Sequence, residues 1–305
     1  MKNSHHYKKY TLFLLIFFFS LPVSAKKIIQ GSVQEGDNII ASKGDIPTPE
    51  KFSTNILNYR QAAVNQLAKT ETALNKLIIN SENKQLIDAQ NNYQQAHYHY
   101  EIIRPIIALF GSSERQLNNR ASFFLKKEND ARFSGFHLVE YQLFVLKDLQ
   151  KSASSAKTLL KNISDLKKRL AIEDIPIPKL VQAAGDGLEL ILTDKLAGIE
   201  NQYSQTDLTD SYANLQGSRL IITILSEHIP ADEYHSLIQQ YDKIGSVLLK
   251  YQLDEGVFQP LNKLPETEKS WLFSQITQLA EQVATLRASL NIDVYYHYKE
   301  ESDEK

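Results

Sequence analysis

Residues 133–144, "FSGFHLVEYQLF", form an almost wholly apolar stretch that carries one histidine and one glutamate, His137 and Glu140. Successive residues of an α-helix rotate by about 100°, so these two side chains would lie on neighbouring ridges of one side. Phe136 and Val139 would face the opposite side. A helix that is apolar nearly all round is buried on all sides. The stretch therefore predicts a fold in which other helices surround this one.

The histidine and the glutamate need partners in such a place, because a buried carboxylate without one is very costly. Either His137 and Glu140 satisfy each other and nearby polar groups, or a bound cation does so. The spacing alone leaves both alternatives open, because a single His-x-x-Glu pattern is much less specific than the two-histidine motif of zinc peptidases.

Apolar residues recur at helical spacing along most of the chain, whereas strand-like alternation and Asn-Gly hairpins are nearly absent. The pattern predicts an all-α protein. Pro105 is expected to kink the second helix. The expected helices cover, in chain order, residues 49–80, 81–108, 115–127, 134–152, 155–171, 178–197, 207–228, 231–252 and 265–290.

The sharpest break is "EDIPIPK", residues 173–179, where two prolines stand one residue apart. We expect two four-helix-type bundles packed together, residues 48–173 with the histidine–glutamate pair and residues 174–292. The polar residues 26–47 are expected to be a flexible segment, and residues 293–305 a solvated tail.

The beginning of the chain has the features of a secretory signal peptide. Its first ten residues carry Lys2, Lys8 and Lys9 and no acid, and "TLFLLIFFFSLP" and "VSA" follow. This order predicts cleavage after Ala25, although an uncleaved anchor helix is the alternative. A lipoprotein needs a cysteine at its cleavage site and the chain has none, so we expect a soluble, unlipidated protein of the periplasm.

Composition limits the chemistry further. The chain has no cysteine, and its one methionine is Met1. Any metal ion bound by the mature protein must therefore use oxygen or nitrogen ligands, which argues against a Cu(I) site and for iron, zinc or manganese. The formal net charge is −2 and no basic patch stands out, so nucleic acid is not an expected partner.

A second stretch, "AHYHYEIIRP" at residues 96–105, places His97, Glu101 and Arg104 on one helix face. An ordinary solvated stripe with a histidine–glutamate pair at i,i+4 is the alternative to a functional site.

Three blocks together resemble the imelysin-like family, and in particular its EfeO/EfeM-type periplasmic iron-uptake proteins. "GFHLVE" fits the Gly-x-His-x-x-Glu signature, and "YEIIRPIIALFG" is similar to a Tyr-Glu-x-Ile-x-Pro segment about 35 residues upstream. The third block is "KLAGIENQYSQTDLTDSYANLQGSR", residues 195–219. The blocks stand in the family's order, and the resemblance covers about residues 50–290.

The resemblance implies a pair of helical bundles and a metal site that combines the signature residues with acids of the other two blocks. The ion would be divalent or trivalent, iron in the first place and zinc in the second. His97 is a further candidate ligand, and so is Asp207, for which a helix-capping role is the alternative. The implied ligands are His137, Glu140, Glu101 and Glu200.

Three positions depart from the family pattern. Arg104 stands where a second glutamate is usual, Asn118 where an aspartate is usual, and Gln205 where a histidine is usual. The changes make the pocket less negative and should weaken the binding of a hard cation. Arg104 could also pair with Glu101 or Glu140 and leave an ion-pair cluster without metal.

The function implied is a non-enzymatic, metal-binding component of an iron uptake system, working with an inner-membrane iron permease and a periplasmic peroxidase-type partner. We expect the short form, because too few residues precede the first helix for the cupredoxin domain of longer members. An imelysin-like metallopeptidase is one alternative, but it would need a general base in addition to the ligands. A helical periplasmic binding protein with a decayed metal site is the other.

Overall fold

The computed structural model describes residues 33–35, 38–40 and 48–292 of the 305-residue chain. Most of these residues are helical, which confirms the predicted all-α fold. The expected signal peptide, residues 1–25, and the expected tail, residues 293–305, lie outside the described residues, as does most of the segment 26–47.

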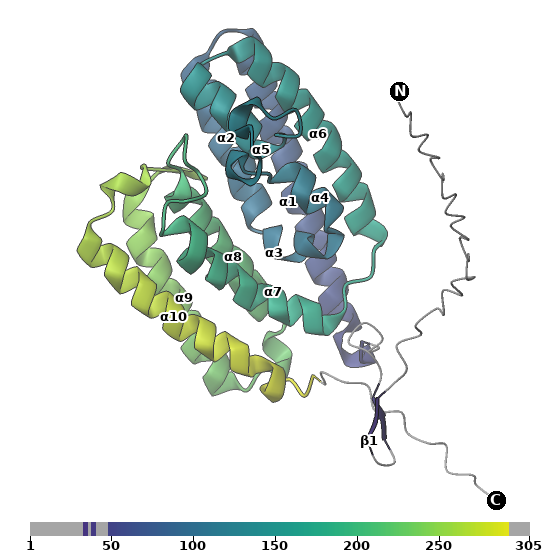
Figure 1. Ribbon diagram of the computed structural model, residues 1–305. Helices are drawn as coiled ribbons and strands as arrows, with labels where there is room; N and C mark the ends of the chain where they lie inside the picture. The colour runs from purple at the N-terminus through teal and green to yellow at the C-terminus, as the bar shows by residue number, and fades with distance from the viewer. Residues whose placement is uncertain (1–32, 36–37, 41–47, 293–305) are drawn as a thin grey trace, which may run out of the picture.

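The ten α-helices of the described residues differ greatly in length, and the long ones form the body of the molecule (Figure 1). Two short antiparallel hairpins accompany them, β1 (Val33–Glu35) with β2 (Asn38–Ile40) and β3 (Gln252–Asp254) with β4 (Val257–Phe258). None of the helices combines the length and the apolar character needed to cross a membrane. The helices are α1 (Ser53–Glu82), α2 (Leu86–Glu101), α3 (Arg104–Ile107), α4 (Ser112–Leu117), α5 (Phe136–Tyr141), α6 (Leu149–Ile172), α7 (Ile177–Leu190), α8 (Asp207–Ile224), α9 (Ala231–Leu248) and α10 (Glu266–Ser289).

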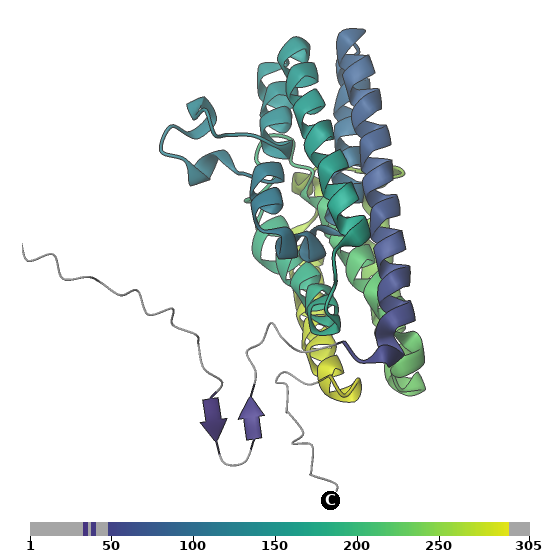
Figure 2. The same ribbon diagram turned by 90° about the vertical axis from the view of Figure 1, so that its right-hand side faces the viewer.

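The long helices pack in two sets. In the first, α1 lies against both α2 and α6, and in the second α7 and α9 each lie against α8 and α10 (Figures 1 and 2). The sets meet where α2 and α1 contact α8, and their buried apolar side chains form one continuous core. Pro176 and Pro178 stand at the start of α7, where a missing backbone N–H costs nothing. We propose that the sets correspond to the two expected bundles.

The helix predicted over residues 115–127 is wrong. The helix α4 ends at Leu117, and two single 3-10 turns follow, Ala121–Phe123 and Lys127–Asn129. The segment projects from the side of the bundle (Figure 2). Phe123 and Leu125 are exposed there, so a helix that continued to residue 127 would bury little further apolar surface and would have little to stabilise it.

The boundary between the expected helices 134–152 and 155–171 is also misplaced. The chain turns at Lys147, which adopts a left-handed conformation with φ 52°. Asp148 then caps α6 by accepting a hydrogen bond from the backbone N–H of Lys151 at 2.9 Å. The signature helix is thus separated from α6 by a tight turn.

Two helices end in a π-helical segment. Gln142–Leu146 (η5) continues α5, and Ile191–Lys195 (η6) continues α7. Single π-turns inside helices are rare and occur frequently at functional sites. Both segments adjoin the buried charges described below, and the last residue of η6 is one of these charges.

Candidate metal centre

Charged side chains lie buried where α2, α5 and α8 meet the loop that follows η6. We call them the buried cluster. Arg104 is 12 % exposed, and the other side chains are at most 1 % exposed. The members are His97, Glu101, Arg104, His137, Glu140, Lys195, Glu200 and Asp210.

His97, Glu101 and Asp210 form a compact group of possible metal ligands. The imidazole Nε2 of His97 lies 3.3 Å from Glu101 Oε1, and its Nδ1 lies 3.1 Å from Asp210 Oδ1. Each of the three residues offers a ligand atom within 4.8 Å of the others. One ion could reach all three atoms, and imidazole with carboxylate suits iron or zinc.

Lys195 lies among the same carboxylates. Its Nζ is 3.1 Å from Glu101 Oε2 and 3.1 Å from Asp210 Oδ2, and it also contacts Glu200 Oε2. Burial by itself lowers the pKa of Lys195, but Asp210, Glu101 and Glu200 outweigh burial and raise the pKa well above its ordinary value. The lysine is therefore a permanent cation at the centre of the cluster.

Arg104 and Asn118, two of the departures from the family pattern, both direct donors at Glu200. Arg104 Nη1 donates to Glu200 Oε1 at 2.5 Å and to Glu101 Oε1 at 3.1 Å. Asn118 Nδ2 donates to Glu200 Oε1 at 3.0 Å. The anticipated pairing of Arg104 with Glu101 is present, and its second partner is Glu200 rather than Glu140. An oxygen that a metal ion would use is thus engaged by protein donors.

His137 and Glu140 form a hydrogen bond with each other. They are the polar pair of the apolar stretch 133–144. Glu140 Oε2 accepts from His137 Nδ1 at 2.8 Å. Glu140 Oε1 accepts from the Tyr203 N–H at 3.1 Å, the Ser204 N–H at 2.8 Å and the Ser204 hydroxyl at 2.7 Å. A carboxylate held in this way fixes the orientation and tautomer of the imidazole. We infer that Glu140 is a positioning residue for His137.

The other nitrogen of His137 faces the cluster. Nε2 is buried and has no hydrogen-bond partner in the described part of the chain, and it lies 3.8 Å from Glu200 Oε1. The His97 and His137 rings lie 6.0 Å apart, centroid to centroid. His137 is therefore continuous with the group formed by His97, Glu101 and Asp210.

Two glycines of the family blocks permit these contacts. A Cβ at Gly135, whose φ is 80°, would lie 2.1 Å from the carbonyl oxygen of Leu117. A Cβ at Gly217 would lie 2.0 Å from the carbonyl oxygen of Ile102. Only glycine allows such approaches. Gly135 thereby holds α5 beside the end of α4, and Gly217 holds α8 beside the end of α2, where Asn214 Nδ2 donates to Glu101 Oε2 at 3.0 Å.

The four residues expected to share a site, His137, Glu140, Glu101 and Glu200, thus lie in one buried cluster together with His97. That they bind a metal remains a prediction. Sequence reasoning did not identify Lys195 and Asp210. A lysine near the end of a helix normally extends into solvent, and Asp210 lies in a helix whose other buried residues are mostly apolar or small polar ones.

Asp207 and Gln205 stand outside the central contacts. The N-cap of α8 is Thr206, so the capping role considered for Asp207 is wrong. Asp207 Oδ1 accepts from the Asn201 N–H at 3.3 Å, and burial together with Asp210 raises the pKa of Asp207 to about 7. Gln205 is exposed, so the loss of the family's histidine there removes no group from the buried cluster.

The ionisation of His137 gives a testable pH dependence. Burial lowers the pKa of His137, but the hydrogen bond with Glu140 and the negative charges of Glu140 and Glu200 outweigh burial and raise the pKa to about 9. A pKa raised by folding contributes stability that is present in full below pH 6.5 and is lost as pH rises through 9. We expect the free energy of unfolding to fall by about 3 kcal/mol between these values.

Urea unfolding at several pH values measures this loss. The fall should be much smaller in His137→Gln, whereas His235→Gln, at an exposed position of α9, should behave as the parent does. An equal fall in His137→Gln and the parent would show that other groups cause it.

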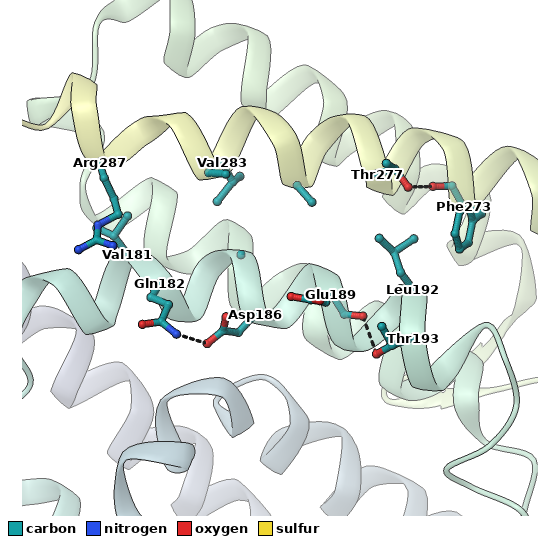
Figure 3. A pocket seen from close by; sticks show the side chains of 13 residues that line it. Val181, Gln182, Asp186, Glu189, Leu192, Thr193, Phe273, Thr277, Val283 and Arg287 are labelled. Atoms are coloured by element: carbon teal, nitrogen blue, oxygen red, sulfur yellow. Dashed lines mark hydrogen bonds between the residues drawn. The ribbon is translucent and has the colours of Figure 1, made fainter. Parts of the chain in front are cut away.

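Open cavities lie beside the buried cluster and elsewhere. A groove of about 690 Å³ runs between α7 and α10 (Figure 3), lined by apolar side chains such as Val181 and Phe273, and it contains no member of the cluster. A cavity of about 400 Å³ borders Arg104, and one of about 600 Å³ is lined by Asn201 and Asp207. The cluster is therefore closed from solvent by Arg104 on one side and by Asn201 and Asp207 on another.

Comparisons with known proteins show the family of the chain. Residues 56–286 match the family model described as Peptidase_M75, imelysin. The iron uptake system component EfeO of Escherichia coli (strain K12) is 32% identical over 204 residues, which are 66% of this chain and 54% of that protein. The EfeO of Shigella flexneri gives the same values. The chain thus spans about half the length of these curated relatives.

A solved structure from Parabacteroides distasonis ATCC 8503, described as an iron-regulated protein A precursor, has a similar fold. The two superpose with a TM-score of 0.54 over 81% of this chain and 97% of that one. At 13% sequence identity, the likeness concerns the helical architecture alone.

Proposed function

Because the chain belongs to the imelysin family, as its three sequence blocks predicted, we propose that it is a metal-binding component of an EfeO-type iron uptake system. Its task would be capture of an iron ion by buried histidine and carboxylate side chains, followed by release to a transporter. The ion is cargo in this proposal, and no bond of a substrate is broken.

The observation that carries the proposal is the group formed by His97, Glu101 and Asp210, whose ligand atoms lie within 4.8 Å of one another. Glu200 and His137 Nε2 adjoin this group. Together they offer only nitrogen and oxygen atoms, which fits iron and, as the second choice, zinc. Glu140 contributes by orienting His137.

The place of action and the partners belong to the same proposal. EfeO is named as an iron uptake component, and the expected signal peptide would direct this chain to the periplasm. We therefore propose a permease of the inner membrane as the acceptor of the ion and a periplasmic peroxidase-type protein as a further partner.

Metal-dependent peptidase activity has less support, although the family carries a peptidase name. Hydrolysis needs an open position on the metal and a free general base. Both oxygens of Glu140 accept hydrogen bonds, and Glu101 and Glu200 are paired with Arg104 and Lys195. These contacts engage the carboxylates of Glu101, Glu140 and Glu200, which favours a binding role.

Titration calorimetry of the purified, chelator-treated protein with Zn²⁺, and with Fe²⁺ under anaerobic conditions, tests the proposal. We expect weak binding by the parent and a loss of at least tenfold, about 1.4 kcal/mol, in His97→Ala. His137→Ala should also lose affinity. The control is His99→Ala, whose ring bonds to Gln66 and lies outside the cluster. A folded parent that binds neither ion would support the decayed-site alternative instead.

A further inference from the structure

Lys195 has an environment that is unusual for a lysine. Its side chain is completely buried, and its Nζ contacts carboxylates of Glu101, Glu200 and Asp210, which come from α2, the loop after η6 and α8. Lysine is a compact, strongly hydrated point charge that is almost never fully buried unless it is paired. The fold therefore brings three separate segments together around this one ammonium group.

The charges of the cluster explain why a cation is needed there. Glu101, Glu140, Glu200 and Asp210 bring four carboxylates into the interior. Removing one partner from such a buried set leaves a charge uncompensated, which is strongly destabilising. Arg104 reaches Glu101 and Glu200 but has no contact with Asp210. Lys195 is the member that joins Asp210 to both glutamates.

We propose that the ammonium of Lys195 occupies the cation position of this site, and that a metal ion binds among Glu101, Glu200 and Asp210 only by displacing it. A further observation points to a cation at the same place. The ring nitrogens of the buried His97 lie within 3.3 Å of Glu101 and Asp210, and neither nitrogen has a hydrogen-bond partner within the described residues. The metal-binding part of the inference rests on the proposed function.

Removing the charge of Lys195 should have an effect that removing a purely structural ion pair would not have. Without the Lys195 amine, the carboxylates would need an external cation, so the protein should become dependent on metal for part of its stability. Its affinity for a divalent ion should rise at least tenfold, because the competing tethered charge is gone. The ligand atoms themselves are unchanged.

The test compares Lys195→Met, which keeps much of the side-chain length without the charge, with the parent and with Lys161→Met at an exposed position of α6. In chelator, we expect the thermal midpoint of Lys195→Met to fall by about 10 °C. With excess Zn²⁺, most of this loss should be recovered, and calorimetry should show the gain in affinity. The parent and Lys161→Met should shift little.

Each outcome decides the matter. If Lys195→Met melts like the parent in chelator, or gains neither stability nor affinity with Zn²⁺, the inference is overturned. If Lys195→Met does not fold in chelator, it is refolded with Zn²⁺ and followed by circular dichroism. Recovery of the helical signal supports the role of Lys195, and failure to fold under both conditions overturns it. If Lys195→Met binds metal and the parent does not, the proposed function is wrong and the role of Lys195 is supported. If both proteins bind metal equally tightly, the proposed function is supported and the role of Lys195 is wrong.

Discussion

Replacing Gly217 by alanine is expected to cost more than about 3 kcal/mol of unfolding free energy. The new Cβ would lie 2.0 Å from the carbonyl oxygen of Ile102 and 3.2 Å from its Cα. Both are backbone atoms, so no side chain can rotate away, and α8 would have to move from the end of α2. That movement would also separate Asn214 from Glu101, whose backbone and side-chain oxygens it contacts.

The matched control is Gly185→Ala in α7, where a Cβ would meet nothing within 4 Å. Alanine is the better helix former, so this variant should be more stable than the parent by about 0.5–1 kcal/mol. Urea unfolding followed by circular dichroism measures both changes. If Gly217→Ala were as stable as the parent, the close approach of α8 to α2 would be wrong.

Reversing the charge at Arg104 should change stability and metal affinity in opposite directions. Arg104→Glu removes the guanidinium that contacts Glu101 and Glu200 and adds another carboxylate. Without metal, we expect a loss of about 3–5 kcal/mol of unfolding free energy, as for a broken buried ion pair. With metal, the same change lowers the local charge by two units, and affinity for Zn²⁺ or Fe²⁺ should rise about a hundredfold, or ~2.7 kcal/mol.

Adding Asn118→Asp should increase the affinity further, because Asn118 donates a hydrogen bond to Glu200 and an aspartate there would be a further acceptor. Arg115→Glu, at an exposed position of α4, makes the same charge reversal outside the cluster and should leave both quantities nearly unchanged. Calorimetry and urea unfolding of the four proteins provide the measurement. An Arg104→Glu variant with the affinity of the parent would show that Arg104 does not compete with the ion.

The buried cluster contains its own cations and donors for the carboxylates. Arg104 and Asn118 direct N–H donors at Glu200, and Lys195 contacts Glu101, Glu200 and Asp210. Whether such a site serves as a weak, exchangeable carrier or binds no ion depends on the balance between these internal cations and the metal. The variants at Lys195 and Arg104 measure that balance, because each removes one internal positive charge and metal affinity is then compared with that of the parent.

The sequence by itself determined the helical class and the family, and it singled out six of the eight residues of the buried cluster. These features depend on the order of residues along short stretches of the chain. The spacing of apolar residues sets the helices, and the three blocks carry the histidines and glutamates in fixed positions. The failed helix over 115–127 shows the limit. Leu117 and Ala121 are buried, but Phe123 and Leu125 are exposed, and a sequence pattern does not show which apolar residues find a partner surface.

Only the tertiary structure decided what surrounds the carboxylates. Lys195 reaches Glu101 across 94 positions of sequence, and Arg104 reaches Glu200 across 96. No local pattern encodes such pairs, because they depend on how α2 packs against α8 and on the π-helical segment that ends at Lys195. A lysine at a helix end ordinarily reaches solvent; here the packing of other segments places it among three carboxylates, where its charge is compensated.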